Sequence, residues 1–417
     1  MQNSYVYWRA SHPLVFISSH LIVGIIIAPA CAQRLTTAIV LSIFAITLFV
    51  LSFLSLTKIR KSYQAMLISI CLISWGIAIK YFSQYNALFS IPYPETFIRD
   101  CRNWVVEKIN STIVNRESNG FALAILLGIK MDMNKSLVNA YMQLGIIHII
   151  AISGMHLEIL FKNLARITQL LPRSRCYLIL ELFILLISVW TYTLMAFASP
   201  SIVRASIFFT IYTIGKFMGA TSFMLNTIAG GILILLLFDS KGLTNIGLQL
   251  SYGAVIGIHL FYKPLFESIL MDNSIIKFFW SNCCMSLAAQ LTTFPILAIH
   301  FHQIAGWVLV SNFIMVPLSN YILYGLAILL ILPLQFSLAF TWGKMMEKYI
   351  QFFNGIVSDW FMQTKAGTIQ ITMTPLQVAL YYIILLFVYL WLYLKQPSWL
   401  LGILGVISTY LLLKLFS

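Results

Sequence analysis

The chain has 417 residues, of which 60% are hydrophobic and only 9% are charged. An ordinary soluble domain carries roughly 25% charged residues. This composition therefore excludes a soluble globular protein and indicates a polytopic helical membrane protein. The 26 Lys and Arg against 12 Asp and Glu give a net charge of +14. Such an excess fits cytoplasmic loops that obey the positive-inside rule, and it also fits a polyanionic substrate such as nucleic acid, so charge alone does not decide between them.

The six cysteines include no C-x-x-C pair, and most of them lie in apolar runs. We expect them to be buried as small hydrophobic residues, with neither a disulfide framework nor a thiolate metal site. The sequence indicates no cofactor.

The first apolar runs, at 13–32, 37–56 and 64–82, predict three membrane spans. Lys58, Arg60 and Lys61 crowd the loop between the second and the third span. Basic loops favour the cytoplasm, so we expect a cytoplasmic N-terminus. The first run lacks a strongly basic leader, and we expect it to be retained rather than cleaved.

Residues 98–115 form the next recognisable element. Apolar or small side chains recur there at helical spacing beside charged residues, at Ile98, Cys101, Val105, Ile109 and Thr112. This pattern predicts an amphipathic helix lying at the outer membrane interface.

The segment Gly145 to Glu158 reads G-I-I-H-I-I-A-I-S-G-M-H-L-E and lies where hydropathy favours a membrane helix. Unpaired polar groups are costly in lipid, so polar, interrupted helices occur mainly where they line a water-filled cavity or are buried in protein. Ser153-Gly154 is a plausible point of interruption, because Gly frees the backbone and Ser can bond a vacated carbonyl. Glu158 and Lys162 are spaced to pair on one helical face.

Further apolar runs complete a fold that we expect to be all-α, with about eleven transmembrane helices plus short broken and interfacial helices. These runs lie near 177–198, 201–218, 222–238, 243–262, 278–299, 303–316, 320–334, 376–394 and 398–416. Residues 342–362 predict an amphipathic helix, and the piece from Thr364 to Thr374 is polar and partly β-like. If Lys395 is cytoplasmic, the C-terminus is outside, and opposite termini require an odd number of crossings.

Four more segments place polar or helix-bending residues inside apolar runs. Pro200 precedes Arg204 by one helical turn, Gln249 and Ser251 share a run, Gln290 precedes Pro295, and Asn312 precedes Pro317. Taken one at a time, each has a structural explanation: polar side chains join helices, and prolines kink them. An intramembrane arginine also needs a partner or a water path.

Together, and in this order, the segments resemble the ComEC family, the DNA-uptake channel proteins of bacterial competence. H-I-I-A-I-S-G-M-H resembles that family's H-L-L-A-I-S-G-L-H, and S-P-S-I-V-R-A resembles its P-S-V-V-R-A. G-L-Q-L-S-Y-G-A-V, A-A-Q-L-T-T-F-P and S-N-F-I-M-V-P-L resemble further motifs in the same order. The earlier L-L-G-I-K-M-D-M is similar to a sixth motif of the family, with Ile129 in place of an acidic residue. The resemblance covers residues 119–335.

The resemblance implies a channel that carries single-stranded DNA across the bacterial cytoplasmic membrane during natural transformation. It implies a DNA path near the motif residues, namely His148, Ser153, Gly154, His156, Arg204, Gln249, Ser251, Gln290 and Asn312, with breaks or kinks at Gly154, Pro200, Pro295 and Pro317. Arg204 is the best candidate for a phosphate contact, because a guanidinium matches phosphate geometry and keeps its charge.

We expect three regions: N-terminal anchoring helices over 1–97, the channel core over 98–335, and an amphipathic helix with C-terminal spans over 336–417. Longer family members carry an extracellular oligonucleotide-binding fold and a nuclease domain. Here only 83–118 could occupy the place of the first, and no H-x-H-x-D-H occurs. The resemblance therefore implies a short form whose DNA receptor, nuclease and ATPase or helicase are separate chains. His300-Phe-His302 alone does not indicate a metal site.

Two other functions remain open at this stage. Ala151-Ile-Ser153-Gly154 is close to the G-x-S-G of rhomboid proteases, with His148 and His156 nearby, which would indicate an intramembrane serine hydrolase. A transporter of a small solute or lipid on a related scaffold would instead have a pocket sealed at the membrane midplane. No nuclease, ATPase or clear protease motif occurs, so we expect no enzyme activity. Because there is no Walker A motif, any ATP-driven pulling must come from a partner.

Overall fold

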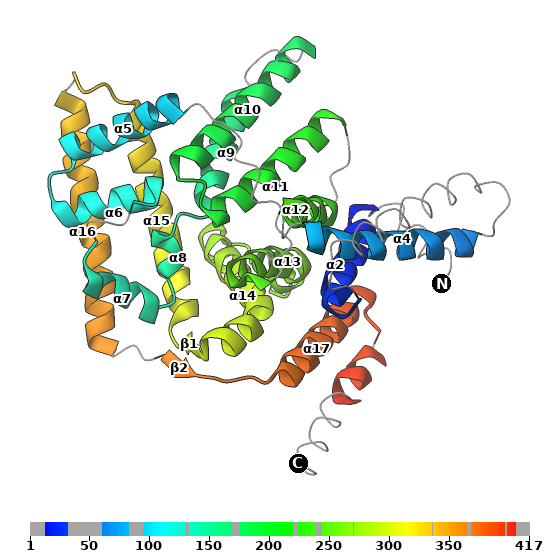
Figure 1. Cartoon of the computed structure of the whole chain (residues 1–417). Coiled ribbons are helices and arrows are strands. Elements are labelled where there is room, and N and C mark those ends of the chain that lie inside the picture. Colours follow the sequence, from blue (N-terminus) through cyan, green and yellow to red (C-terminus); the bar gives the residue numbers. More distant parts are fainter. Residues whose placement is uncertain are drawn as a thin grey trace. The chain divides into compact units, whose positions relative to one another are not determined.

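A computed structural model describes residues 13–31, 61–82, 95–129, 133–168, 175–219, 224–238, 244–269, 271–335, 337–364, 368–396 and 398–405. The expected second span, Lys58 and Arg60 lie outside these residues. The chain is all-α, as predicted, and its described residues add one two-stranded antiparallel ladder (Figure 1). This ladder pairs β1 (Gln303–Ala305) with β2 (Thr368–Gln370), and β2 falls within the piece expected to be β-like.

Four helices in the described part of the chain are long and apolar enough to cross a membrane. These helices are α10 (Arg175–Met195), in which Tyr177–Met195 is the apolar part, α14 (Ser274–Phe301), α15 (Val308–Ile331) and α17 (Pro375–Leu394). Shorter apolar stretches lie at Pro13–Ile27, Ile68–Ile77 and Met224–Leu237. These helices make the chain a membrane protein, and the count of about eleven crossings stays a prediction.

The helices fall into two compact units that interleave along the sequence. The first comprises Met1–Glu95, Leu157–Thr193 and Ile202–Leu248, and the second comprises Thr96–His156, Leu194–Ser201 and Gln249–Ser417. The expected division at residues 97 and 335 stays a prediction.

In the first unit, two glycines let α2 (Pro13–Cys31) and α4 (Lys61–Phe82) cross at close range. A Cβ on Gly24 would lie 2.1 Å from the carbonyl oxygen of Ile73, and one on Gly76 would lie 2.2 Å from that of Leu21. Ser18 donates a 2.9 Å hydrogen bond to the Ala229 carbonyl and so joins α2 to α12 (Met224–Phe238). Small residues at a helix crossing are typical of membrane proteins, where close packing replaces the hydrophobic effect.

We expect Gly24→Ala to destabilise the protein by about 1–3 kcal/mol, because the new methyl group meets backbone that cannot rotate away. Gly215→Ala is the matched control, because a Cβ there meets nothing within 4 Å. Melting of the detergent-solubilised protein measures both. Equal melting temperatures for the two variants would show that the crossing is not tight.

The rest of the first unit packs α9 (Gly154–Thr168) against α10 and α11 (Pro200–Phe217). Leu157, Phe161, Leu185 and Val189 form its buried cluster. Phe161 stacks on Phe209 with ring centroids 4.6 Å apart.

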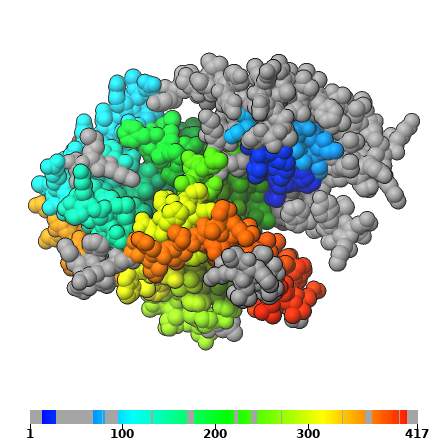
Figure 2. Space-filling model, turned by 60° about the horizontal axis from the view of Figure 1, so that its bottom comes forward, coloured from blue at the N-terminus to red at the C-terminus, as the bar shows by residue number. Residues whose placement is uncertain are grey.

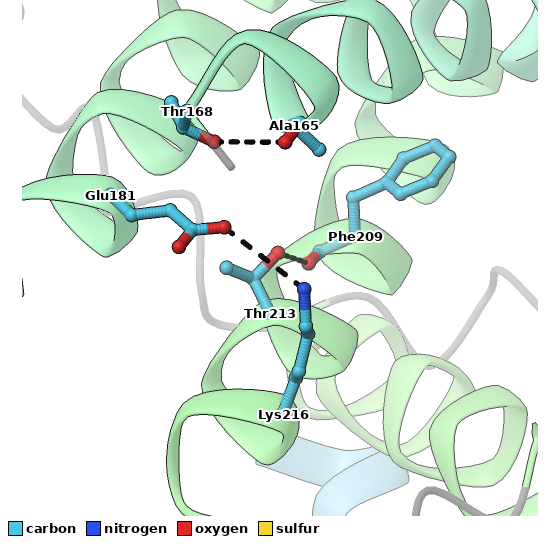
Figure 3. A network of polar contacts seen from close by, with 6 residues as sticks. All are labelled: Ala165, Thr168, Glu181, Phe209, Thr213 and Lys216. Carbon is cyan, nitrogen blue, oxygen red and sulfur yellow. Dashed lines mark hydrogen bonds and ion pairs between the residues drawn. The ribbon is translucent and has the colours of Figure 1, made fainter. Parts of the chain in front are cut away.

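The polar edge of this cluster is drawn in Figure 3. Lys216 reaches Glu181 at 4.0 Å, and the Thr213 hydroxyl donates to the Phe209 carbonyl at 2.6 Å. On α9, Lys162 and Glu158 form the predicted i,i+4 ion pair at 2.5 Å. Both its side chains are largely exposed, so it contributes little stability.

The second unit has a core of large side chains between α6 (Arg116–Leu127), α7 (Lys135–Gln143) and α16 (Ser337–Thr364). Phe121, Tyr141 and Phe353 are fully buried, with ring centroids 5.7–6.4 Å apart. The Tyr141 hydroxyl donates to Asn354 Oδ1 at 2.8 Å, so its polar end is paired.

The helix expected over 98–115 is present as α5 (Glu95–Thr112), and its position at the outer membrane interface stays a prediction. Ile98, Val105 and Ile109 are at most 4% exposed, so this face of the helix is covered by protein. Lys108 is buried as well and donates to the Leu332 carbonyl at the C-terminal end of α15, where the helix dipole favours a cation. The α5 sequence is amphipathic because one face of the helix packs on protein. Helical periodicity alone cannot distinguish such a face from one that contacts lipid.

Candidate functional site

The polar segment after α7 is an interrupted helix. Gly145 has φ +74° and turns the chain into α8 (Ile147–Ile150), after which residues 151–153 run without helix until α9 begins at Gly154. A Cβ on Gly145 would lie 2.7 Å from Val308 Cγ2 and 2.9 Å from Ala305 Cβ. Both the backbone angle and the packing therefore require glycine at 145. Gly154, the glycine that sequence singled out, begins α9 without a positive φ.

The backbone groups of the interruption have protein partners. The Ala151 N–H donates to the Ile147 carbonyl at 3.1 Å, and the Ser201 hydroxyl donates to the Ile152 carbonyl at 2.8 Å. Irregular backbone at membrane depth persists only when such groups are satisfied. Ser201, the second residue of α11, thus stabilises the break. The sequence indicated the break but not this partner.

Ser153 and His156 form a cap on α9. The Ser153 N–H donates to His156 Nδ1 at 3.0 Å, and the His156 N–H donates to the Ser153 carbonyl at 3.1 Å. A side chain at the third helical position that accepts from the N-cap N–H is half of a capping box. Because Nδ1 accepts a hydrogen bond from an amide N–H, this nitrogen carries no proton and the imidazole is neutral.

The Ser153 hydroxyl also lies 3.1 Å from Nδ1. His156 is 3% exposed, and its Nε2 has no hydrogen-bond partner within the described parts of the chain. His148, on α8, is exposed.

The segment carrying Asn312 lies against this break. Ser311 donates to the Leu144 carbonyl at 2.6 Å, and Val308 is the residue on which Gly145 packs. Asn312 itself is 9% exposed, and its Oδ1 has no partner among the residues described. Pro317 lies inside α15. The structure therefore places the beginning of the last motif against Leu144 and Gly145, the turn that leads into the first motif.

The motifs of α13 (Ile246–Glu267) and α14 are also adjacent. Thr292 donates to the Gly253 carbonyl at 2.7 Å, and a Cβ on Gly257 would lie 2.3 Å from the Ala288 carbonyl oxygen. Gln249, Ser251 and Gln290 are partly buried close to this contact in sequence.

Arg204 belongs to the first unit and is 9% exposed on α11. Its guanidinium Nη2 lies 3.9 Å from the point where a Cβ on Gly247 would be, so it sits beside the start of α13. Pro200 is the first residue of the same helix, a position where its missing N–H costs nothing. The S-P-S-I-V-R-A and G-L-Q-L-S motifs are thus neighbours.

Arg102 is a further residue that sequence reasoning missed. Its Nε and Nη2 donate to the carbonyls of Met195 and Leu194 at 2.9 and 3.0 Å, and its guanidinium carbon lies 3.7 Å from the ring centre of Phe197. Phe197 and Ala198 both have positive φ, 57° and 46°, a costly conformation for non-glycine residues. Arg102 therefore holds the strained turn that leads into Pro200 and Ser201.

Within the described residues, no group of three His, Cys, Asp or Glu side chains could hold a metal ion. His302 ends α14 in the left-handed conformation, and its Nδ1 lies 3.2 Å from the Ala298 carbonyl oxygen.

The fold and the site define an all-α membrane protein with an interrupted polar segment packed against long apolar helices. A family model described as "Competence protein" matches residues 125–396, well over half of the chain. The chain belongs to this competence protein family.

One curated relative is "ComE operon protein 3" of Bacillus subtilis (strain 168), 28% identical over 267 residues. The match covers 62% of this chain and 33% of the relative, so the chain spans about a third of that protein's length. No solved structure gives a significant match.

Proposed function

We propose that the chain forms a channel that moves single-stranded DNA across the bacterial cytoplasmic membrane during natural transformation. The observation that carries this proposal is the family match, because residues 125–396 include the break and all of the proposed path residues. The break itself supports a transport role, since a polar interruption among apolar helices typically lines a transport path. The DNA receptor, nuclease and ATPase or helicase would be separate chains.

Arg204 is the proposed phosphate contact. It sits one turn inside α11, close to a helix N-terminus, where the macrodipole also favours an anion. His148, Ser153, Gly154, His156, Gln249, Ser251, Gln290 and Asn312 are proposed to line the same path.

A deletion strain tests the proposal. Transformation should be lost when the gene is deleted and restored when the intact gene is supplied again. Normal transformation by the deletion strain would contradict it, and transport of a small solute or lipid would then be the better function.

Catalysis by Ser153 is the second candidate, because its hydroxyl lies 3.1 Å from His156 Nδ1. The cap geometry explains that contact without catalysis. The capping contact uses the backbone N–H of Ser153, so we expect Ser153→Ala to keep the fold and part of its transport, and we expect the parent protein to resist fluorophosphonate labelling. Melting, transformation and fluorophosphonate labelling are the measurements. Labelling of the parent at Ser153, together with complete loss of function in a stably folded Ser153→Ala, would establish a hydrolase instead.

We also propose that the N-terminus is cytoplasmic and the C-terminus extracytoplasmic, with about eleven crossings between them. The basic residues Lys58, Arg60 and Lys61 motivate the first assignment and Lys395 the second. Reporter fusions at Lys61 and Ser417 should report opposite compartments. The same compartment for both would contradict this topology.

A further inference from the structure

Pro295 leaves a backbone acceptor open inside α14. A proline has no N–H, so the carbonyl four residues earlier, that of Leu291, loses its helical donor. In lipid such a group must find another donor or it destabilises the fold.

Two consecutive tyrosines of α17 donate to this turn. The Tyr381 hydroxyl donates to the Leu291 carbonyl at 3.0 Å, and the Tyr382 hydroxyl donates to the Thr292 carbonyl at 2.8 Å. The Tyr381 ring also packs on Phe294, with centroids 5.7 Å apart. Figure 2 shows the segment containing α17, in orange, against the yellow-green and yellow helices of its own unit.

The short β ladder fixes how α17 lies along α14, at the C-terminal end of α14 and the N-terminal end of α17. β1 follows α14, β2 precedes α17, and the two strands pair with Gln303 opposite Gln370. A full capping box at Thr374 and Gln377 then starts α17. This arrangement places both hydroxyls on the helical turn that precedes Pro295.

On its other side the same turn is held by α13. Thr292 bonds the Gly253 carbonyl, and a Cβ on Gly257 would lie 2.2 Å from Thr292 Oγ1. The turn before Pro295 is therefore bonded to both α13 and α17, and Gln290 directly precedes Leu291, whose carbonyl accepts from Tyr381.

We propose that Tyr381 and Tyr382 are positioning residues that hold α14 in its proline-bent form and so set the orientation of Gln290. The part of this assignment that concerns transport rests on the proposed DNA channel. The part that concerns the bend does not depend on it.

Spin labels on either side of Pro295 test the bend directly. Met285 and Phe301 are exposed and flank it, and sixteen residues of straight helix span roughly 24 Å. In a transformation-competent background without native cysteines, Tyr381→Phe/Tyr382→Phe should broaden the distance distribution. Tyr389→Phe, which alters the same helix where its ring packs on Phe261, should leave it unchanged.

Pro295→Ala supplies the missing N–H, so the double tyrosine variant should then have no further effect on the distance. Transformation should fall about tenfold in Tyr381→Phe/Tyr382→Phe, the loss expected for two hydrogen bonds. An unchanged distribution in that variant, or an equal broadening with Ala at 295, would overturn the assignment. A changed distribution with full transformation would show that the bend is unrelated to uptake. Failure of the channel proposal itself would be seen in a different experiment, as normal transformation by the deletion strain.

Discussion

Arg204→Ala is expected to reduce transformation by at least about 30-fold while the protein remains folded in the membrane. Removing one member of a buried, hydrogen-bonded charge pair costs about 2–5 kcal/mol, and each 1.4 kcal/mol corresponds to roughly tenfold. Arg204→Lys should recover only part of the activity, because an ammonium group cannot bind phosphate bidentately.

Lys216→Ala is the matched control for this experiment. It removes one positive charge from the same helix, where Lys216 is largely exposed and reaches Glu181 only at 4.0 Å. We expect close to normal transformation from it. If Arg204 instead ties helices together, Arg204→Ala should strand buried carbonyls at about 1–3 kcal/mol each and lower the melting temperature. A loss of stability in proportion to the loss of transport would contradict the phosphate role.

Gly145→Ala is expected to destabilise the protein by about 2–5 kcal/mol and to abolish transport. The left-handed backbone angle contributes about 1–2 kcal/mol, and the clash with Val308 and Ala305 contributes about 1–3 kcal/mol. Gly219→Ala separates the two contributions. Gly219 has a similar φ of +71°, and a Cβ there meets nothing within 4 Å.

Melting and transformation should therefore distinguish the two glycine variants. We expect Gly219→Ala to lose only the contribution of the backbone angle and to transform normally. Equal stability losses in both would mean that the packing of Gly145 on α15 does not hold the break in place.

The sequence predicted the all-α class, the pairing of Glu158 with Lys162, and the family. These features depend on composition, local spacing and motif order, all of which are readable along one chain. It did not predict the packing of the α5 stripe, because Ile98 and Ile109 look the same to periodicity whether they face lipid or protein. The sequence drew attention to Gly154, whereas the structure requires glycine at 145.

The partners that explain the break are distant in sequence. Ser201 lies 49 residues from Ile152, and Ser311 lies 167 residues from Leu144. Tyr381 and Tyr382 went unnoticed for a similar reason, because an aromatic pair in an apolar helix ordinarily indicates lipid contact. Their hydroxyls are explained only by the structure, in which they donate to the carbonyls that precede Pro295 in α14.

Photocross-linking of incoming DNA tests the central claim most directly, namely that the break lines the DNA path. A photoreactive phenylalanine analogue would replace His148, which is exposed on α8, and separately Ile187, which is 63% exposed on α10. Labelled DNA would be added to cells that still transform, followed by illumination. We expect a protein–DNA adduct at position 148 and none at 187. Transforming cells that give no adduct at 148, or equal adducts at both positions, would contradict the account.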